Sequence, residues 1–130
     1  MARAWDDARH DELLNGVRGI CMSFPEVSER LSHEMPTWFV HEKRVVAYFV
    51  ADHHDDGYLG FMCPAPDGVQ AELIEAEPDR FYRPPYFGHR GWIGVHLAED
   101  CDWDEVREIL LDAYRKVAPK VLAAQLEAGK

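Results

Sequence analysis

The sequence has 130 residues, and its 14 Lys and Arg against 24 Asp and Glu give a formal net charge of −10 at pH 7. Domains commonly run about 100 to 150 residues, so we expect one domain over residues 1–130. Hydrophobic residues make up 47 % and charged residues 29 % of the chain, proportions that exclude a disordered acidic tail and a collagen-like fibre. The negative charge argues against generic nucleic-acid binding, because affinity for the phosphate backbone comes from clustered Lys and Arg.

The sequence predicts a cytoplasmic protein without a membrane partner. No apolar run approaches the roughly 20 residues of a spanning helix, and residues 1–10 lack the apolar core of a signal peptide. The three cysteines, Cys21, Cys63 and Cys101, are odd in number, widely spaced and never in a C-x-x-C pair. That usage indicates reduced thiols in an intracellular protein.

The first half of the chain predicts one helix followed by several short strands. Apolar residues recur at three- and four-residue spacing over residues 7–23, which is typical of an amphipathic helix, and Pro25 cannot continue it. Short β-rich runs, broken at Pro36 and over residues 52–57, then predict strands over residues 27–33, 37–41, 45–51 and 58–63. Their short connections favour antiparallel pairing.

The second half predicts two further helices, each introduced by a capping box, around one more strand. Asp67 with Gln70 begins a short helix that ends at Pro78, and Asp102 with Glu105 begins a longer one that Pro119 interrupts. Residues 92–97 read as a strand, and residues 120–126 as further helical turns. Together the elements predict an α+β fold, a two-layer sandwich with an antiparallel sheet and helices on one side.

Residues 80–98 contain no acid although the chain is strongly acidic, and we call them the basic-aromatic segment. Arg83, His89 and Arg90 are candidates for phosphate contact, and Tyr86 and Trp92 for stacking on a ligand or supporting the loop. In the alternative, the aromatic rings fill the gap between the sheet and the last helix, and the arginines pair with the surplus carboxylates.

Trp38, Lys43 and Arg44 form a second candidate contact patch at neighbouring strand ends. The alternative, which we favour, is a tryptophan packed under the first helix and an exposed basic hairpin tip that discourages edge pairing. A protein interface would instead expose contiguous apolar surface such as Trp38, Phe39 and Tyr48 together.

Catalytic and metal signals are weak in this sequence. The polar cluster over residues 53–56 (His-His-Asp-Asp) resembles metal ligands, but adjacent residues seldom point at one centre, so we expect a solvated loop and no metal. There is no nucleophile elbow, phosphate-binding glycine loop or dinucleotide fingerprint, so we assign no cofactor and no catalytic residue. The enzymatic alternative uses His89 or His96 as a general acid or base, with Cys63 as a nucleophile.

The sequence resembles the MmcQ/YjbR-like family of small bacterial proteins. The resemblance is carried by Pro25-Glu26-Val27, by His33 with Pro36-Thr37-Trp38-Phe39-Val40 and Lys43, by Asp79-Arg80-Phe81, by the stretch from Pro84 to Val95, by Trp103-Asp104-Glu105 with Tyr114, and by Ala118-Pro119-Lys120. It implies the order α-β(3)-α-β(2)-α, a fold also seen in type III secretion chaperones. Members are described as predicted DNA-binding proteins with a double-wing arrangement.

These observations predict a small, non-enzymatic binding module whose partner is DNA or a phosphate-bearing ligand. The contacts are expected from the basic-aromatic segment together with Lys43 and Arg44. Binding should be weak because few phosphates are neutralised, and strongly salt-sensitive because the contacts are electrostatic. Two alternatives stay open: a protein-interaction module, by analogy with the secretion chaperones, and a binder of another small ligand.

Overall fold

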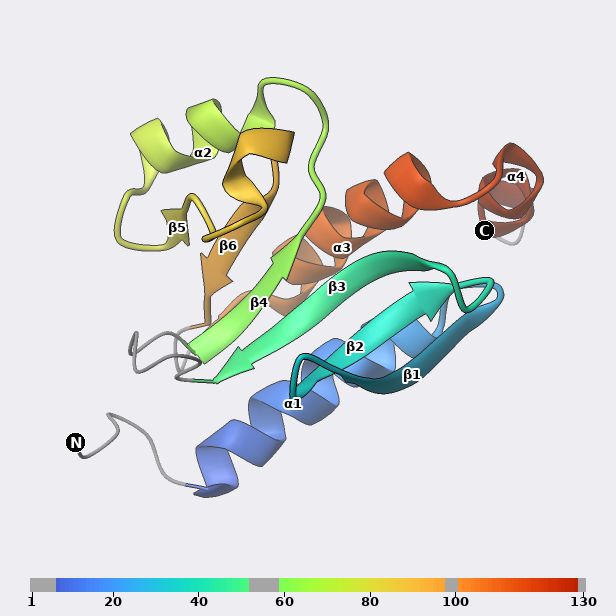
Figure 1. Cartoon of the computed structure of the whole chain (residues 1–130), viewed down its shortest axis with the longest axis horizontal. Coiled ribbons are helices and arrows are strands. Elements are labelled where there is room, and N and C mark those ends of the chain that lie inside the picture. The colour runs from blue at the N-terminus through green and yellow to red at the C-terminus, as the bar shows by residue number, and fades with distance from the viewer. Residues whose placement is uncertain (1–6, 52–58, 98–100, 129–130) are drawn as a thin grey trace.

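The computed structural model describes residues 7–51, 59–97 and 101–128 of the chain (Figure 1). In chain order its elements are α1 (Asp7–Met22), β1 (Val27–Ser32), β2 (Met35–Val40), β3 (Arg44–Ala51), β4 (Leu59–Cys63), α2 (Val69–Ala76), β5 (Phe81–Tyr82), the 3-10 turn η2 (Gly88–Arg90), β6 (Ile93–His96), α3 (Trp103–Val117) and α4 (Lys120–Ala128). In this part of the chain, no helix is both long enough and apolar enough to cross a membrane.

The strands form one six-stranded antiparallel sheet in the order β1-β2-β3-β4-β6-β5. Helices α1 and α3 lie side by side across one face of it (Figure 1), which confirms the predicted α+β architecture. The element order differs in detail from the one that the resemblance implied, because four strands precede α2 and α4 follows α3.

The main core fills the space between this face and the two helices. Helix α1 contributes Leu13 and Val17, α3 contributes Leu110 and Tyr114, and the inward-facing strand side chains include Trp38, Phe49 and Phe61. The Tyr114 hydroxyl donates a hydrogen bond to the Pro25 carbonyl at 2.8 Å, which ties α3 to the chain just after α1. The predicted stop of the first helix at Pro25 is therefore also a packing point for the last long helix.

Tertiary contacts decide the outcome of three local sequence signals. The Asp67 and Gln70 capping box is wrong: α2 begins after Gly68 with no side-chain cap, and Gln70 bonds elsewhere. The Asp102 cap is confirmed, since its carboxylate accepts from the Asp104 and Glu105 amides, but the Glu105 carboxylate pairs with Arg80. Pro36 does not break β2, because it lies beyond the last β2–β3 pair and its missing N–H costs no bond to β3.

Two hairpin turns have residues other than glycine at positions of positive φ, where glycine is usual. His33 and Glu34 (φ 53° and 68°) connect β1 to β2, and His41, Glu42 (φ 54° and 58°) and Lys43 connect β2 to β3. Two consecutive residues of positive φ are the geometry of a type I′ hairpin, whose sequence signal is Asn-Gly. The strand ends predicted at residues 33 and 41 are instead turn residues, because that signal is absent.

Gly16 and Gly19 of α1 provide a matched test of the packing between α1 and α3. A Cβ at Gly16 would lie 2.1 Å from Cη2 of Trp103, whereas one at Gly19 would meet nothing within 4 Å. Gly19→Ala should raise the free energy of unfolding by about 0.5–1 kcal/mol through helix propensity. Gly16→Ala should lower it by about 1–3 kcal/mol, because the added methyl displaces the Trp103 ring.

Urea denaturation of the two variants measures both effects against wild type. Equal stabilisation by both substitutions would contradict the close approach of Trp103 to α1.

Candidate anion-binding cleft

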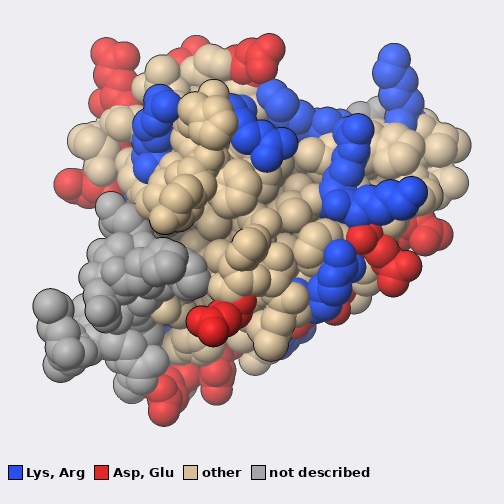
Figure 2. Space-filling model, viewed as in Figure 1, with Lys and Arg blue, Asp and Glu red and all other residues tan. Residues whose placement is uncertain are grey.

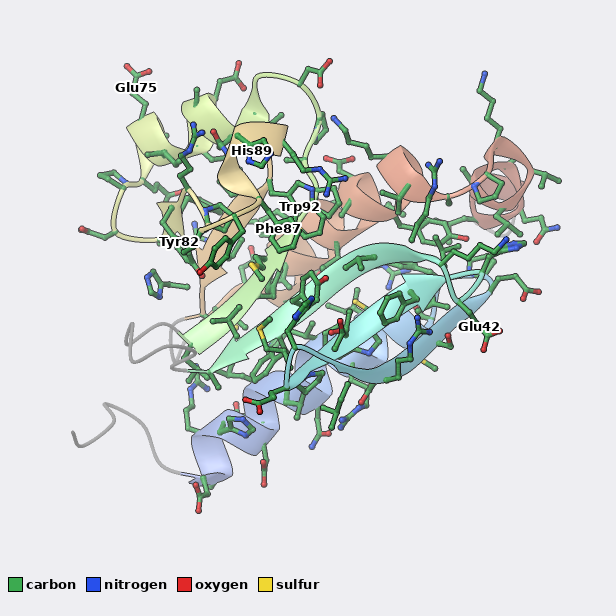
Figure 3. All side chains as sticks on the ribbon, viewed as in Figure 1. Glu42, Glu75, Tyr82, Phe87, His89 and Trp92 are labelled. Carbon is green, nitrogen blue, oxygen red and sulfur yellow. The ribbon has the colours of Figure 1, made fainter. Side chains whose placement is uncertain are left out.

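A smaller apolar cluster lies on the face of the sheet opposite α1 and α3. Its buried members are Met35, Tyr48, Val50, Met62 and Trp92, with Val45 and Phe87 packed against them. Phe87 and Trp92 come from the basic-aromatic segment, whose η2 turn folds over the sheet here (Figure 3). The segment is therefore anchored by its own aromatic side chains.

The side chain of Gln70 fixes this turn from α2. Its amide nitrogen donates to the Gly88 carbonyl at 2.8 Å and to the Trp92 carbonyl at 2.5 Å, one at each end of the turn. Gly91, which ends the turn, has φ 82°, a conformation that favours glycine, and a Cβ at Gly88 would lie 2.3 Å from Cγ of Arg83 and would displace that side chain. The sequence thus places a rigid, glycine-dependent turn between two aromatic residues.

Tyr86 is held in a strained conformation immediately before the turn. Its φ is 68°, and the Phe87 amide donates to the Pro85 carbonyl at 2.8 Å, which is the hydrogen-bond pattern of a γ-turn with positive φ. The Tyr86 side chain is nevertheless 78 % exposed. No burial offsets the strain, and residues held this way are concentrated at binding sites and switch regions.

The rings form a compact floor beneath Arg90. Phe87 and Trp92 stack with centroids 4.6 Å apart and planes 21° apart, and Tyr48 of β3 lies 5.6 Å from Phe87. The Arg90 guanidinium carbon lies 5.9 Å from the Trp92 ring centroid and 6.0 Å from that of Phe87. This floor places an exposed cation over aromatic faces, within the range of a cation–π contact.

These three aromatic side chains line part of a cleft of about 510 Å³, which we call the first cleft. It is lined by Lys43, Arg44, Val45, Tyr48, Pro64, Phe87, Arg90, Trp92, Lys116 and Val117. Four of these ten side chains are cations and none is an acid. Figure 2 shows Lys and Arg side chains gathered on this face of the molecule around an uncharged surface, with the carboxylates mostly toward the rim.

Three of the four cations are available to a ligand. Lys116 Nζ is engaged, because it donates to the Ala65 carbonyl at 2.9 Å and pairs with Asp67 at 3.0 Å. Lys43, Arg44 and Arg90 are exposed, and none of their side chains makes an ion pair with any residue that the structure describes. An anion entering the cleft would therefore meet unneutralised positive charge.

Arg80 and Arg18, which lie outside the cleft, are each matched to carboxylates. Arg80 pairs with Glu105 and with Glu77, and the hydrogen bond to Glu105 is the main cause of its raised pKa. Arg18 donates to Glu29, which also accepts from the Trp38 indole at 2.9 Å, and the bond from Arg18 chiefly lowers the pKa of Glu29. The alternative of paired arginines thus holds for Arg80 and does not hold for Arg83 or Arg90 within the described residues.

The cleft brings together four residues that the sequence analysis singled out, namely Lys43, Arg44, Arg90 and Trp92. Arg83, Tyr86 and His89 are exposed on the same segment but do not line it. Lys116, Pro64 and Val117 were missed, because Lys116 reads as helix surface, Val117 as part of the apolar face of the same helix, and Pro64 as the residue after a strand. Only the fold reveals their proximity.

Trp38 is removed from the candidate contact residues. It is fully buried in the core beneath α1, as in the alternative we favoured, and its indole bonds to Glu29. Phe39 and Tyr48 are 6 % and 5 % exposed, so the apolar patch expected of a protein interface is not formed by these three side chains.

The enzymatic alternative gains little from the geometry. Cys63 is buried, and that burial strongly raises the pKa of its thiol, which leaves it protonated and weakly nucleophilic. Neither His89 nor His96 lines the first cleft. The described residues hold no group of three or more metal-ligating side chains, and the cluster at residues 53–56 lies outside them.

Comparison with known proteins places these features in a family context. The model of the YjbR family matches residues 22–116, which run from the end of α1 through most of α3 and include both the η2 turn and the β2–β3 turn. Neither the curated proteins nor the solved structures yield a match to the chain.

Replacing Gln70 by Ala should loosen the η2 turn while leaving the sheet folded. The carbonyls of Gly88 and Trp92 lose their shared donor, at a cost of about 1–3 kcal/mol. The amides of Arg90 and Gly91, which bond within the turn, should then exchange hydrogen at least tenfold faster by NMR. Gln125→Ala, at an exposed position of α4, is the matched control. Unchanged hydrogen exchange in the Gln70→Ala variant would show that Gln70 does not hold the η2 turn.

Proposed function

The chain belongs to the YjbR family, and from the first cleft we propose that it is a binding protein whose ligand is a nucleic acid held through its phosphates. One observation carries the proposal: Lys43, Arg44 and Arg90, contributed by two separate segments, line one cleft with aromatic side chains and no carboxylate. Lys and Arg side chains that release counterions from phosphates supply most of the affinity of such contacts.

The overall charge of −10 does not oppose this proposal at close range. Charges farther than about 8 Å from a phosphate are screened at physiological ionic strength. Glu29 is moreover paired with Arg18, and Glu77 and Glu105 share the single positive charge of Arg80. Local cations then dominate the contact, while the distant acids limit its strength.

The aromatic side chains favour a nucleic acid over a bare phosphate. Phe87 is partly exposed in the wall of the cleft, and Tyr86 beside it in the sequence presents its ring to solvent. A base stacked on an exposed aromatic ring gains about 1–3 kcal/mol, whatever its identity. Stacking of this kind adds affinity without sequence specificity.

Fluorescence polarisation with labelled single-stranded and duplex DNA tests the proposal directly. We expect saturable binding at low salt that weakens as salt is added, because each phosphate contact contributes about −0.7 to the logarithmic salt slope for single strands. The Arg44→Ala/Arg90→Ala variant should bind at least tenfold more weakly, with a salt slope shallower by about 1 to 2.

Arg9→Ala/Arg107→Ala is the matched control, since it removes the same charge from the helices on the other face. This control should bind as wild type does. Equal weakening of the two double variants would show that only total charge matters, and absence of binding at low salt would refute the proposal.

A further inference from the structure

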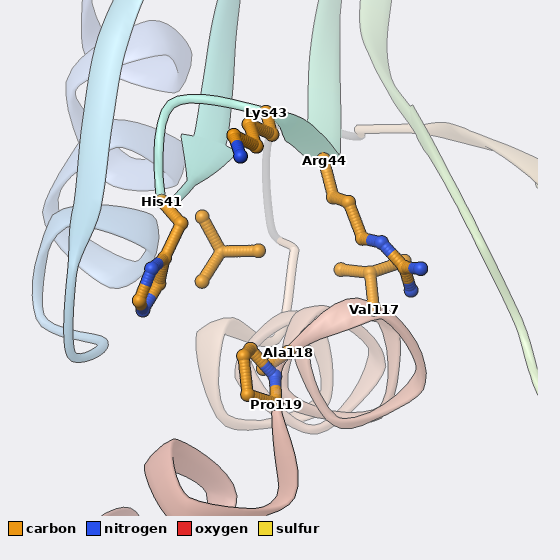
Figure 4. A pocket seen from close by; sticks show the side chains of 7 residues that line it. His41, Lys43, Arg44, Val117, Ala118 and Pro119 are labelled. Carbon is orange, nitrogen blue, oxygen red and sulfur yellow. The ribbon is translucent and has the colours of Figure 1, made fainter.

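A second cleft, of about 330 Å³, lies between the β2–β3 turn and the junction of α3 with α4 (Figure 4). Its two walls have different chemistry. One carries His41, Lys43 and Arg44 and the other carries Val117, Ala118 and Pro119. As in the first cleft, no carboxylate belongs to its lining.

The two clefts adjoin each other. Lys43, Arg44 and Val117 line both of them, so these three side chains form the boundary between the clefts. The pair of unneutralised cations therefore faces both spaces at once. A ligand that extended from one cleft into the other would pass directly over Lys43 and Arg44.

Backbone geometry fixes both walls of the second cleft. His41 and Glu42 have positive φ, the Lys43 amide donates to the Val40 carbonyl at 3.1 Å, and Arg30 donates to the Glu42 carbonyl at 3.1 Å. Across the cleft, the Ala118 amide donates to the Tyr114 carbonyl at 2.8 Å, and Pro119 begins the change of direction into α4. The space is preformed, which lowers the ordering cost of binding.

The alternation of polar and apolar surface matches a single strand of nucleic acid. Phosphates require cations, which lie at the shared boundary, whereas bases and sugars require flat or apolar surfaces, which Phe87 offers in the first cleft and Pro119 in the second. Bases in a duplex are stacked inside and cannot enter such recesses, while those of a single strand can be splayed apart. Each volume lies within the lower range of small-ligand pockets, about 300–1,000 Å³.

We propose, on the basis of the nucleic-acid function above, that the two clefts form one groove for two successive nucleotides of a single strand. The phosphate between these nucleotides lies on Lys43 and Arg44, one nucleotide occupies the first cleft, and the other occupies the second.

Competition against a labelled thymidine decamer tests this arrangement with the 130-residue chain. The competitors are thymidine monophosphate, the 5′-phosphorylated thymidine dinucleotide, and a duplex of equal strand concentration. The dinucleotide should displace half of the labelled decamer at a concentration at least tenfold lower than the mononucleotide requires. The duplex should require a concentration at least tenfold higher than the unlabelled single-stranded decamer does.

Ala118→Leu places a larger side chain in the second cleft and should abolish the gain from mononucleotide to dinucleotide. Ala124→Leu on the exposed side of α4 is the matched control and should retain the gain. Should Ala118→Leu disturb the α3–α4 junction, His41→Asn tests the opposite wall, because Asn also tolerates positive φ.

The outcomes separate the two proposals. The two-nucleotide groove is overturned if the dinucleotide competes no better than the mononucleotide, or if Ala118→Leu and Ala124→Leu change the gain from mononucleotide to dinucleotide equally. Either result leaves phosphate binding in the first cleft intact. Failure of the labelled decamer to bind while labelled duplex DNA still binds overturns the groove alone. Failure of both to bind at low salt overturns the proposed function, and the groove with it.

Discussion

The Gln70 amide joins the two ends of the η2 turn by donating to the carbonyls of Gly88 and Trp92. The positions of Phe87, Trp92 and Arg90 depend on this link. With the turn fixed, Phe87 and Trp92 stack over Tyr48 of β3, and Arg90 lies above their rings. A turn without that link would present the same residues to solvent, but it would not hold Arg90 across the cleft from Lys43 and Arg44.

Charge segregation makes this arrangement effective in an acidic chain. Carboxylates at Glu29, Glu77 and Glu105 take arginine partners on the helices and the β5 edge, and Asp67 takes Lys116. The cations left without acidic partners in the described part of the chain include those on the β2–β3 turn and the η2 turn, which the sheet order brings to one face. A net charge therefore says little about the potential at one cleft.

Local sequence patterns predicted the helices and every strand except β5. Much of the cleft was predicted too, since Arg90 and Trp92 of the basic-aromatic segment and Lys43 and Arg44 of the second candidate patch were recognisable by type. What escaped prediction depended on distant partners. Gln70 reads as a capping residue until the η2 carbonyls are placed beside it. Trp38, by contrast, is buried as the favoured interpretation of the sequence predicted. Lys116 lies on an ordinary helix surface, and only the packing of α3 beside β3 brings it to the cleft.

The most direct measurement of the central claim is a nitrogen–proton NMR titration of the protein with a single-stranded thymidine decamer. Binding in the cleft predicts that the largest amide shifts fall at residues 41–45, 87–92 and 116–118, and that they disappear in the Arg44→Ala/Arg90→Ala variant. Largest shifts on the outer surfaces of α1 and α3, with the η2 turn unaffected, would contradict it.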